Sequence, residues 1–464
     1  MTLPDDFVWG VATSAFQIEG SADTDGRGPS IWDWFARQKG AIAGGHTADT
    51  ACDHYHRFEQ DIALLKQLGV GAYRLSISWP RVMPEGTGAV NAAGLGFYDR
   101  LIDAVLAAGI TPWVTLYHWD YPLALHHRGG WLNPESPVWF ERYTRAVVDR
   151  LGDRVAHWFT LNEPQIFIEH GYGAGTHAPG LKLPIADQLL MGHHALIAHG
   201  LAVKCIRERS QVNPTIGWGP AGRVKCPQTN APEDLEAARN DMFATEADSL
   251  WSNTWFGDPV VLGHYPEDAL RAYGKDAPTF SARELETICQ PLDFYGVTIY
   301  SADIVRAGAD GQAVVCDREP GFPQTSFNWP IEPDCLYWGP RLLHERYQLP
   351  IVISENGMAA FDAPTLDGEI VDSHRIDYTR RHLQALSRAV DDGTPISAYF
   401  HWSLLDNFEW AEGYRQRFGL VYVDFKTLKR TPKASAKWYQ RVIDTNGASL
   451  WDGLPQPSAV AAIV

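Results

Sequence analysis

The sequence predicts an α/β protein built as a single (β/α)8 TIM barrel, with its active site at the C-terminal ends of the strands. Eight short runs rich in β-branched and aromatic residues recur along the 464 residues. Segments with helical periodicity lie between several of these runs, and no low-complexity linker divides the chain. Alternating strands and helices are typical of a parallel sheet covered by helices. A doubly wound open sheet is the alternative fold.

The predicted strands follow one another at intervals that leave room for helices and long loops. In order they are residues 7–14, 70–78, 109–118, 154–162, 215–219, 292–300, 349–356 and 394–402. Apolar residues three and four positions apart predict a helix that ends at Gly69 and another that ends at Gly109, since glycine commonly follows a helix C-terminus. We expect the barrel to span residues 1–445 and a C-terminal tail to span residues 446–464.

Polar and aromatic side chains gather where the predicted strands end. They are Gln17, His118, Asn162, Glu163, Tyr300, Glu355 and Trp402, with Arg74 inside the second run. Only the fifth run ends without such a residue. Active sites of (β/α)8 barrels form on the loops that follow the strands, so this distribution predicts a polar pocket lined by aromatic rings.

Glu163 and Glu355 follow the fourth and seventh runs, whose ends should face one another across the barrel mouth. Pro164 disfavours a helical conformation at Glu163, and Gly357 predicts a sharp turn directly after Glu355. Glycoside hydrolysis uses two carboxyl groups, one that protonates the departing oxygen and one that attacks or activates water. A lone Glu at a strand end is most often a solvated surface residue, so the spacing alone decides nothing.

Longer motifs run through nearly the whole chain, from Phe7 to Asp424. They are FVWGVATSAFQIEG, GRGPSIWDWF, YRLSISWPR, LYHWDYP, GGW, TLNEP, GYGAGTHAPG, ISENG, HWSLLDNFEW and RFGLVYVD. In these motifs the sequence resembles glycoside hydrolase family one, the β-glucosidase family. The resemblance implies a retaining β-glucosidase that hydrolyses short β-glucosides such as cellobiose. It also implies that Glu163 is the acid/base and Glu355 the nucleophile.

The resemblance also implies which residues bind the sugar. Those expected to bind the hydroxyls of the glycone, the sugar ring that is released, are Gln17, His118, Asn162, Glu409 and Trp410. Trp402 is implied as the platform beneath the ring. Arg74 and Tyr300 are expected near Glu355, where a cation keeps that carboxylate ionised and its charge raises the pKa of Glu163. Trp329 and Phe418 are candidates for the walls of the aglycone side.

Two positions depart from the family pattern. Thr298 stands where the family usually has Asn, which puts in doubt one hydrogen bond near the nucleophile. Gln165 replaces the common Trp after Pro164, which predicts a more polar aglycone side. Among the 18 Trp residues, we expect Trp119 and Trp131 near the barrel mouth.

The composition and the N-terminal sequence limit which binding partners and which cellular compartment we expect. With 39 Lys and Arg against 56 Asp and Glu, the net charge is −17, which argues against nucleic acid or an anionic membrane surface as partner. We expect a neutral small-molecule β-glycoside; the sequence does not predict the oligomeric state. No secretory signal or membrane span is recognised, and six scattered cysteines without a C-x-x-C pair predict reduced thiols. A cytoplasmic location is therefore expected.

No cofactor or metal is expected. Residues 217–222 fit the G-x-G-x-x-G pattern of dinucleotide-binding proteins, but Pro220 lies inside it and a polar, turn-rich stretch follows where a helix should begin. The histidine pairs 126–127 and 193–194 lack the spacing of metal ligands.

Three alternative functions remain. A 6-phospho-β-glycosidase is disfavoured by Glu409, because a carboxylate at the edge of the glycone pocket repels a phosphate dianion. A transglycosidase would use the same residues and is not separated by the sequence. A non-catalytic sugar-binding barrel is disfavoured because a pure binder needs no acid paired with a nucleophile. The sequence does not fix glucose over galactose or fucose.

Overall fold

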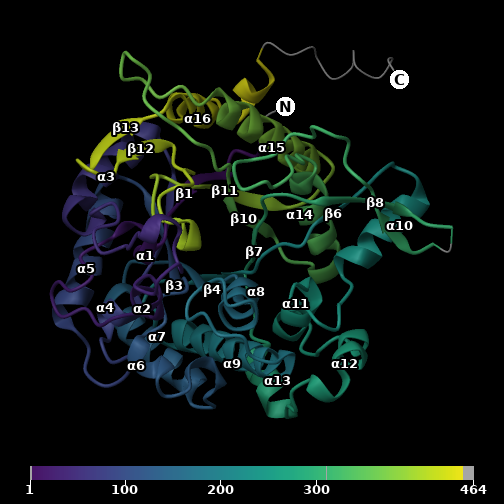
Figure 1. Ribbon diagram of the computed structural model, residues 1–464, viewed down its shortest axis with the longest axis horizontal. Helices are drawn as coiled ribbons and strands as arrows, with labels where there is room; N and C mark the ends of the chain where they lie inside the picture. The colour runs from purple at the N-terminus through teal and green to yellow at the C-terminus, as the bar shows by residue number, and fades with distance from the viewer. Residues whose placement is uncertain (1–2, 310, 453–464) are drawn as a thin grey trace.

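The computed structural model describes residues 3–309 and 311–452, and its centre is an eight-stranded parallel sheet (Figure 1). The strands are β1 (Val8–Ala12), β2 (Ala72–Ser76), β3 (Thr111–Tyr117), β4 (His157–Asn162), β5 (Thr215–Gly219), β7 (Tyr295–Thr298), β10 (Ile351–Asn356) and β11 (Ile396–Trp402). Each lies within one of the eight predicted runs. The predicted (β/α)8 barrel is confirmed.

Neighbouring strands follow the order β5-β4-β3-β2-β1-β11-β10-β7, and the two end strands meet at an irregular seam. Asp293 N donates to Ile216 O at 2.9 Å, and Thr298 N donates to Pro220 O at 3.1 Å. A Cβ on Gly296 would lie 2.3 Å from Trp218 O, so only glycine allows the two strands to approach this closely. The seam closes the sheet into a barrel and excludes the open doubly wound sheet.

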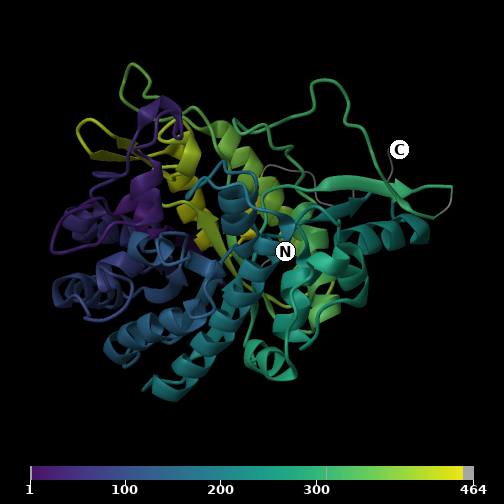
Figure 2. The same cartoon turned by 60° about the horizontal axis from the view of Figure 1, so that its bottom comes forward.

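Helices surround the strands, as the two views show (Figures 1 and 2). The longer ones are α3 (His54–Leu68), α5 (Ala92–Ala107), α7 (Ser136–Leu151), α9 (Ile185–Arg209), α10 (Pro232–Met242), α11 (Asn253–Val261), α14 (Cys335–Tyr347), α15 (Ser373–Asp391) and α16 (Ala434–Asp444). The shorter ones are α1 (Ala15–Ile18), α2 (Ile31–Phe35), α4 (Trp79–Val82), α6 (Leu123–His126), α8 (Pro164–Ile168), α12 (Glu267–Tyr273) and α13 (Ala282–Ile288). The predicted end of α3 is confirmed, because Gly69 follows it with φ +71°.

Helix α9 is long and apolar enough to cross a membrane by length and composition alone. However, 78% of its most apolar window is buried inside the protein. It packs along α7 and α13, so its apolar character is that of a core helix.

Two small sheets were not predicted. One contains β6 (Lys225–Pro227), β8 (Asp303–Ala307) and β9 (Ala313–Val315); the other is the hairpin of β12 (Val421–Asp424) and β13 (Lys429–Pro432). Strand β6, not a helix, follows the G-x-G-x-x-G segment, as expected for a loop rather than a phosphate site. The small sheet of β6, β8 and β9 extends away from the barrel (Figure 2).

Of the two tryptophans expected near the barrel mouth, Trp119 and Trp131, one lies in the core instead. Trp131 is 0% exposed and packs against Tyr117 and Phe167, so its expected place at the mouth is wrong. Gly129 and Gly130, directly before it, both have positive φ, a conformation that glycine adopts without strain. Trp119 does line the cavity described below.

The C-terminal segment is packed onto the barrel as far as the structure describes it. Asn446 Nδ2 donates to Leu3 O at 2.8 Å, and Gln384 Nε2 on α15 donates to Leu450 O at 2.8 Å. Residues 453–464 of the expected tail lie outside the described residues. The boundary at residue 445 stays a prediction.

Candidate active site

A cavity of about 620 Å³ opens at the C-terminal ends of the barrel strands. Carboxyl groups and aromatic rings form its inner part. The lining includes Glu163, Tyr300, Glu355, Trp402, Glu409 and Trp410. The predicted polar pocket with aromatic walls is therefore present at the predicted end of the barrel.

Glu163 directly follows β4 and is 8% exposed. Its backbone is left-handed, with φ +45° and ψ 65°, a conformation uncommon for residues other than glycine. Pro164 is the first residue of α8, where a missing N–H costs nothing. Glu163 N donates to Gly219 O at 2.7 Å, so the strand stops abruptly and the carboxyl group enters the cavity.

Glu355 lies on β10 and is 3% exposed. Gly357 follows it, but not for the predicted reason, because this glycine does not have positive φ. A Cβ there would lie 1.9 Å from Trp402 O. Glycine is needed because the ends of β10 and β11 approach closely, which also sets Trp402 beside Glu355.

Arg74, which is fully buried behind the cavity lining, joins the two halves of the site. Its Nη1 donates to Glu355 Oε1 at 2.6 Å, and its Nη2 donates to Asn162 Oδ1 at 2.6 Å. Asn162 Nδ2 in turn donates to Glu163 Oε2 at 3.3 Å. Tyr300 donates its hydroxyl hydrogen to Glu355 Oε2 at 2.8 Å, so both oxygens of Glu355 are held.

The carboxyl groups differ in electrostatic environment. Burial, and then the charge of Glu355, raises the pKa of Glu163 to about 8. Burial also raises the pKa of Glu355, and the adjacent Arg74 with the hydrogen bonds from Arg74 and Tyr300 offsets part of that rise. Glu163 is therefore the protonated member at neutral pH, while Glu355 has the cation that favours its ionised form.

Thr298 contacts the acid rather than the nucleophile. Its Oγ1 donates to Glu163 Oε1 at 2.5 Å, although the strand register places it opposite Glu355. Its side chain points across the β5–β7 seam, and Glu355 accepts its side-chain hydrogen bonds from Arg74 and Tyr300, so the doubt about one hydrogen bond near the nucleophile stays a prediction.

Gln17 and Asn162 lie directly behind the cavity lining. Gln17 Nε2 donates to Glu409 Oε2 at 3.3 Å and to Phe408 O at 3.0 Å, and Gln17 is 0% exposed. Burial, and then the charges of Glu355 and Glu163, raises the pKa of Glu409 to about 8. Gln17 thus orients a carboxyl group that faces the cavity.

Flat rings form the wall around Glu409. His118 stacks on Trp402 at 5.7 Å and on Trp410 at 6.1 Å between ring centroids. Burial, and then Arg74, holds the pKa of His118 well below its usual range, so His118 is neutral. Indole and imidazole faces beside hydrogen-bonding groups are suited to a sugar ring, which is apolar on its faces and polar at its edge.

The outer wall contains the two aglycone candidates. Trp329 lies 5.2 Å and Phe418 lies 6.1 Å from Tyr300, measured between ring centroids. Both line the cavity. Gln165 does not make this side more polar: it is 1% exposed and exchanges hydrogen bonds with the backbone of Ala221 at 3.2 and 3.3 Å.

Further polar residues around the mouth were not predicted. They are His170, Thr176, His177, Arg223, Trp251 and Asp303. The GYGAGTHAPG motif contains Thr176 and His177 and could have drawn attention to them. The others do not follow a predicted strand end directly: His170 lies in a helical turn after α8, Asp303 begins β8, and Arg223 and Trp251 lie on loops. Arg223 comes after the one predicted strand that ended without a polar residue.

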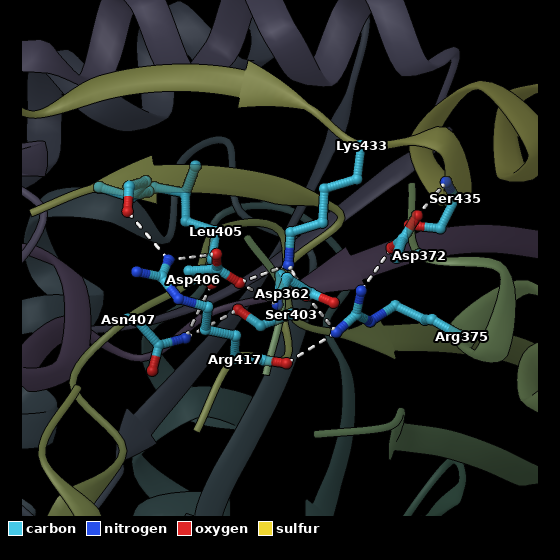
Figure 3. A network of polar contacts seen from close by, with 12 residues as sticks. Asp362, Asp372, Arg375, Ser403, Leu405, Asp406, Asn407, Arg417, Lys433 and Ser435 are labelled. Carbon is cyan, nitrogen blue, oxygen red and sulfur yellow. Dashed lines mark hydrogen bonds and ion pairs between the residues drawn. The ribbon is translucent and has the colours of Figure 1, made fainter. Parts of the chain in front are cut away.

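A buried charge cluster holds the loop that carries Glu409 and Trp410 (Figure 3). Lys433 Nζ lies 2.5 Å from Asp362 Oδ2 and 2.7 Å from Asp406 Oδ1. Asp406 also pairs with Arg417 at 2.7 Å, and Arg375 pairs with Asp362 at 2.7 Å. The cluster ties the loop after β10 and the loop after β11 to the start of α16.

No group of three or more His, Cys, Asp or Glu side chains among the described residues could hold a metal ion. The two members of the His193–His194 pair point to different partners, Tyr265 OH and Trp131 O. All six cysteines are free.

Known proteins similar to this chain include several sugar-cleaving enzymes. The family model described as glycosyl hydrolase family 1 matches residues 1–448. "Beta-glucosidase A" of Acetivibrio thermocellus is 44% identical over 453 residues, which cover 96% of this chain and 99% of the relative. "Beta-glucosidase A" of Thermotoga maritima is 43% identical, covering 96% and 98%.

Solved structures of a β-glucosidase are similar to this chain as well. A β-glucosidase from Thermotoga maritima in complex with glucoimidazole matches with a TM-score of 0.88 at 42% identity, covering 96% of this chain and 99% of that chain. Its complex with deoxynojirimycin matches with the same TM-score, identity and coverage.

Proposed function

The chain belongs to glycosyl hydrolase family 1 and is a retaining glycoside hydrolase, and we propose that it releases terminal non-reducing β-D-glucosyl residues from short β-glucosides such as cellobiose. One observation carries the assignment of roles. Two buried carboxyl groups line one cavity, and only Glu355 is paired with a cation, at 2.6 Å. That asymmetry is what a proton donor and a nucleophile require of two chemically identical side chains.

In the first step, Glu355 bonds to the anomeric carbon while Glu163 gives its proton to the glycosidic oxygen and the bond to the aglycone breaks. The new ester removes the negative charge of Glu355. Because that charge raises the pKa of Glu163, the loss lets Glu163 remain ionised. Glu163 then takes a proton from water, the water oxygen attacks the anomeric carbon, and Glu355 leaves as a carboxylate with retained configuration.

The glycone is proposed to lie against Trp402 and Trp410, with its hydroxyls at Glu409 and His118. Gln17 and Asn162 support this assignment by their contacts with Glu409 and with Glu163. Trp329 and Phe418 would contact the aglycone. The carboxyl groups around the glycone disfavour a 6-phosphorylated sugar. Glu409, whose pKa is raised to about 8, offers a phosphate dianion no positive charge, and an ionised Glu355 would oppose it.

The function is tested by Glu355→Gly with 4-nitrophenyl β-glucoside. We expect turnover to be abolished, sugar binding to remain, and azide to restore cleavage by taking the place of the lost carboxylate. Near-normal turnover without azide would show that Glu355 is not the nucleophile. A non-catalytic sugar-binding barrel predicts no turnover in the parent protein either.

The sequence does not decide which sugar the enzyme prefers, so kcat/KM should be measured for a panel of nitrophenyl glycosides. We expect the highest kcat/KM for the glucoside over the galactoside and the fucoside, and a lower value for the 6-phosphate. A large increase with the 6-phosphate would assign a 6-phospho-β-glycosidase. Product analysis with added alcohol separates a transglycosidase, which would yield mainly the alkyl glucoside.

We also propose a cytoplasmic enzyme in cellulose breakdown that acts on small molecules rather than on nucleic acid or membranes. The six free thiols and the net charge of −17 support this placement. Comparison of activity in cytosolic and secreted fractions of the source cells tests it.

A further inference from the structure

Thr298 reaches Glu163 from a rigid part of the barrel. It is the last residue of β7, at the seam with β5, and it is 2% exposed. Its N donates to Pro220 O at 3.1 Å, and its O accepts from Gly222 N at 2.9 Å. With the backbone held on both sides, the 2.5 Å contact between Oγ1 and Glu163 Oε1 is a fixed feature of the site.

The hydroxyl of Thr298 has one proton to give. Within the described residues its hydrogen-bond partner is Glu163 Oε1, so the satisfied arrangement points this proton at Oε1. An oxygen that accepts this hydrogen bond is the poorer place for the acidic proton. Among the residues that the structure describes, Oε2 has only the longer 3.3 Å contact with the amide of Asn162, which leaves a lone pair free to carry the proton.

We propose that Thr298 is a positioning residue for Glu163, which assigns proton transfer to Oε2 and stabilises the carboxylate left after that transfer. The proposal rests on the proposed function, because it requires Glu163 to be the acid and the base. In the first step the proton leaves Oε2 for the glycosidic oxygen as the bond to the aglycone breaks, and Oε1 keeps its hydrogen bond. In the second step Oε2 recovers a proton from water.

The hydrogen bond also sets the strength of the acid. Burial and the charge of Glu355 raise the pKa of Glu163, and the contact with Thr298 lowers it. A donor to the ionised form makes Glu163 a stronger acid in the first step and a weaker base in the second. Thr298 therefore balances the two steps.

The test compares Thr298→Val, which keeps the shape and removes the hydroxyl, with Thr298→Ser, which keeps the hydroxyl. The upper limb of the pH profile is the fall of kcat/KM at high pH, where Glu163 loses its proton. For Thr298→Val we expect this limb to move to higher pH by about one unit, the scale of one hydrogen bond to a charged group. We also expect kcat/KM for aryl glucosides with poor leaving groups to fall on the order of 10-fold relative to good ones. Thr298→Ser is expected to keep the wild-type upper limb.

Thr160→Val is the matched control, because Thr160 is also a buried strand threonine, on β4, and it bonds His199 Nδ1 at 2.6 Å away from the cavity. Its pH profile should be that of the wild type, whatever its Tm. Thr298→Ala repeats the comparison should the valine variant not fold.

An unchanged upper limb in folded Thr298→Val or Thr298→Ala would overturn the proposal. Equal shifts in Thr298→Val and Thr298→Ser would also overturn it, because they would implicate packing rather than the hydroxyl. A separate result would show that the proposed function itself is wrong: Glu163→Gln would keep full activity on substrates with poor leaving groups.

Discussion

Arg74 and Glu355 form a buried ion pair at the cavity, with Glu355 in the lining and Arg74 behind it. Nη1 lies 2.6 Å from Oε1, and the two side chains are 1% and 4% exposed. The same guanidinium donates to Asn162 through its other terminal nitrogen. One cation therefore both favours the ionised nucleophile and orients the residue next to the acid, and this double role can be tested.

Arg74→Met should lower kcat/KM on the order of 100-fold, the scale for loss of one preorganised donor. Because Arg74 lowers the pKa of Glu355, its removal keeps Glu355 protonated to higher pH. The lower limb of the kcat/KM profile should therefore move to higher pH. Arg74→Lys keeps the charge without the two-pronged contact and should move that limb less. A lower limb at the wild-type position in Arg74→Met would contradict the ion-pair argument.

Tyr300→Phe removes one hydrogen bond to Glu355 Oε2 and keeps the ring contacts with Trp329 and Phe418. We expect kcat to fall about 10-fold, in line with one hydrogen bond to a charged group. The lower limb should move in the same direction as in Arg74→Met, but less. Tyr300→Ala also removes the ring and should raise KM for aryl glucosides. If Tyr300→Phe equals the wild type in kcat and pH profile, the hydroxyl has no role at Glu355.

Glu163→Gln should separate substrates by leaving group. Poor leaving groups need protonation, so their kcat/KM should fall by about 10²–10⁴-fold, while activated aryl glucosides should lose little in the first step. The wild-type acid is lost as pH rises through its pKa of about 8, so the upper limb should disappear in the variant. The measurement is kcat/KM against pH for a series of aryl glucosides, and equal losses across the series would remove Glu163 from the role of acid.

Lys433→Met should destabilise the protein by about 3 kcal/mol, because it leaves Asp362 and Asp406 buried without their shared cation. It should also raise KM for glucosides, since Asp406 anchors the loop that carries Glu409 and Trp410. Urea unfolding and steady-state kinetics measure the two effects.

Lys437→Met, in the first turns of α16 just after Lys433, is the matched control. Its side chain is 71% exposed and lies 3.6 Å from Glu369, so its removal should change the free energy of unfolding by less than about 1 kcal/mol. Equal effects of the two lysine variants would show that the buried cluster does not support the loop.

The barrel could be predicted because its strands are buried on both faces and so read as apolar runs. Strands β8 and β9 have no such run, because they are only five and three residues long and are largely exposed. Gly357 was correctly noted but wrongly explained, since the 1.9 Å approach of Trp402 O depends on a strand that lies 45 residues later in the chain.

The site could be predicted at the level of residues but not of contacts. Glu163 and Glu355 lie at the ends of predicted strands and Arg74 lies inside one, and the barrel brings such positions together. The direction of a side chain does not follow from its motif. Thr298 lies opposite Glu355 in register and still bonds Glu163, and Gln165 turns to the backbone of Ala221. Both outcomes depend on how β5 and β7 meet at the seam.

The charge cluster of Figure 3 also has a consequence for the order in which the site is completed during synthesis of the chain. Glu163 and Glu355 are synthesised before Asp406, and Lys433, which neutralises Asp362 and Asp406, leaves the ribosome only after the last barrel strand. We expect a nascent chain that stops before Lys433 to hold its reacting carboxyl groups beside an unfinished glycone wall. The growing polypeptide would then acquire sugar binding only when its final helix docks.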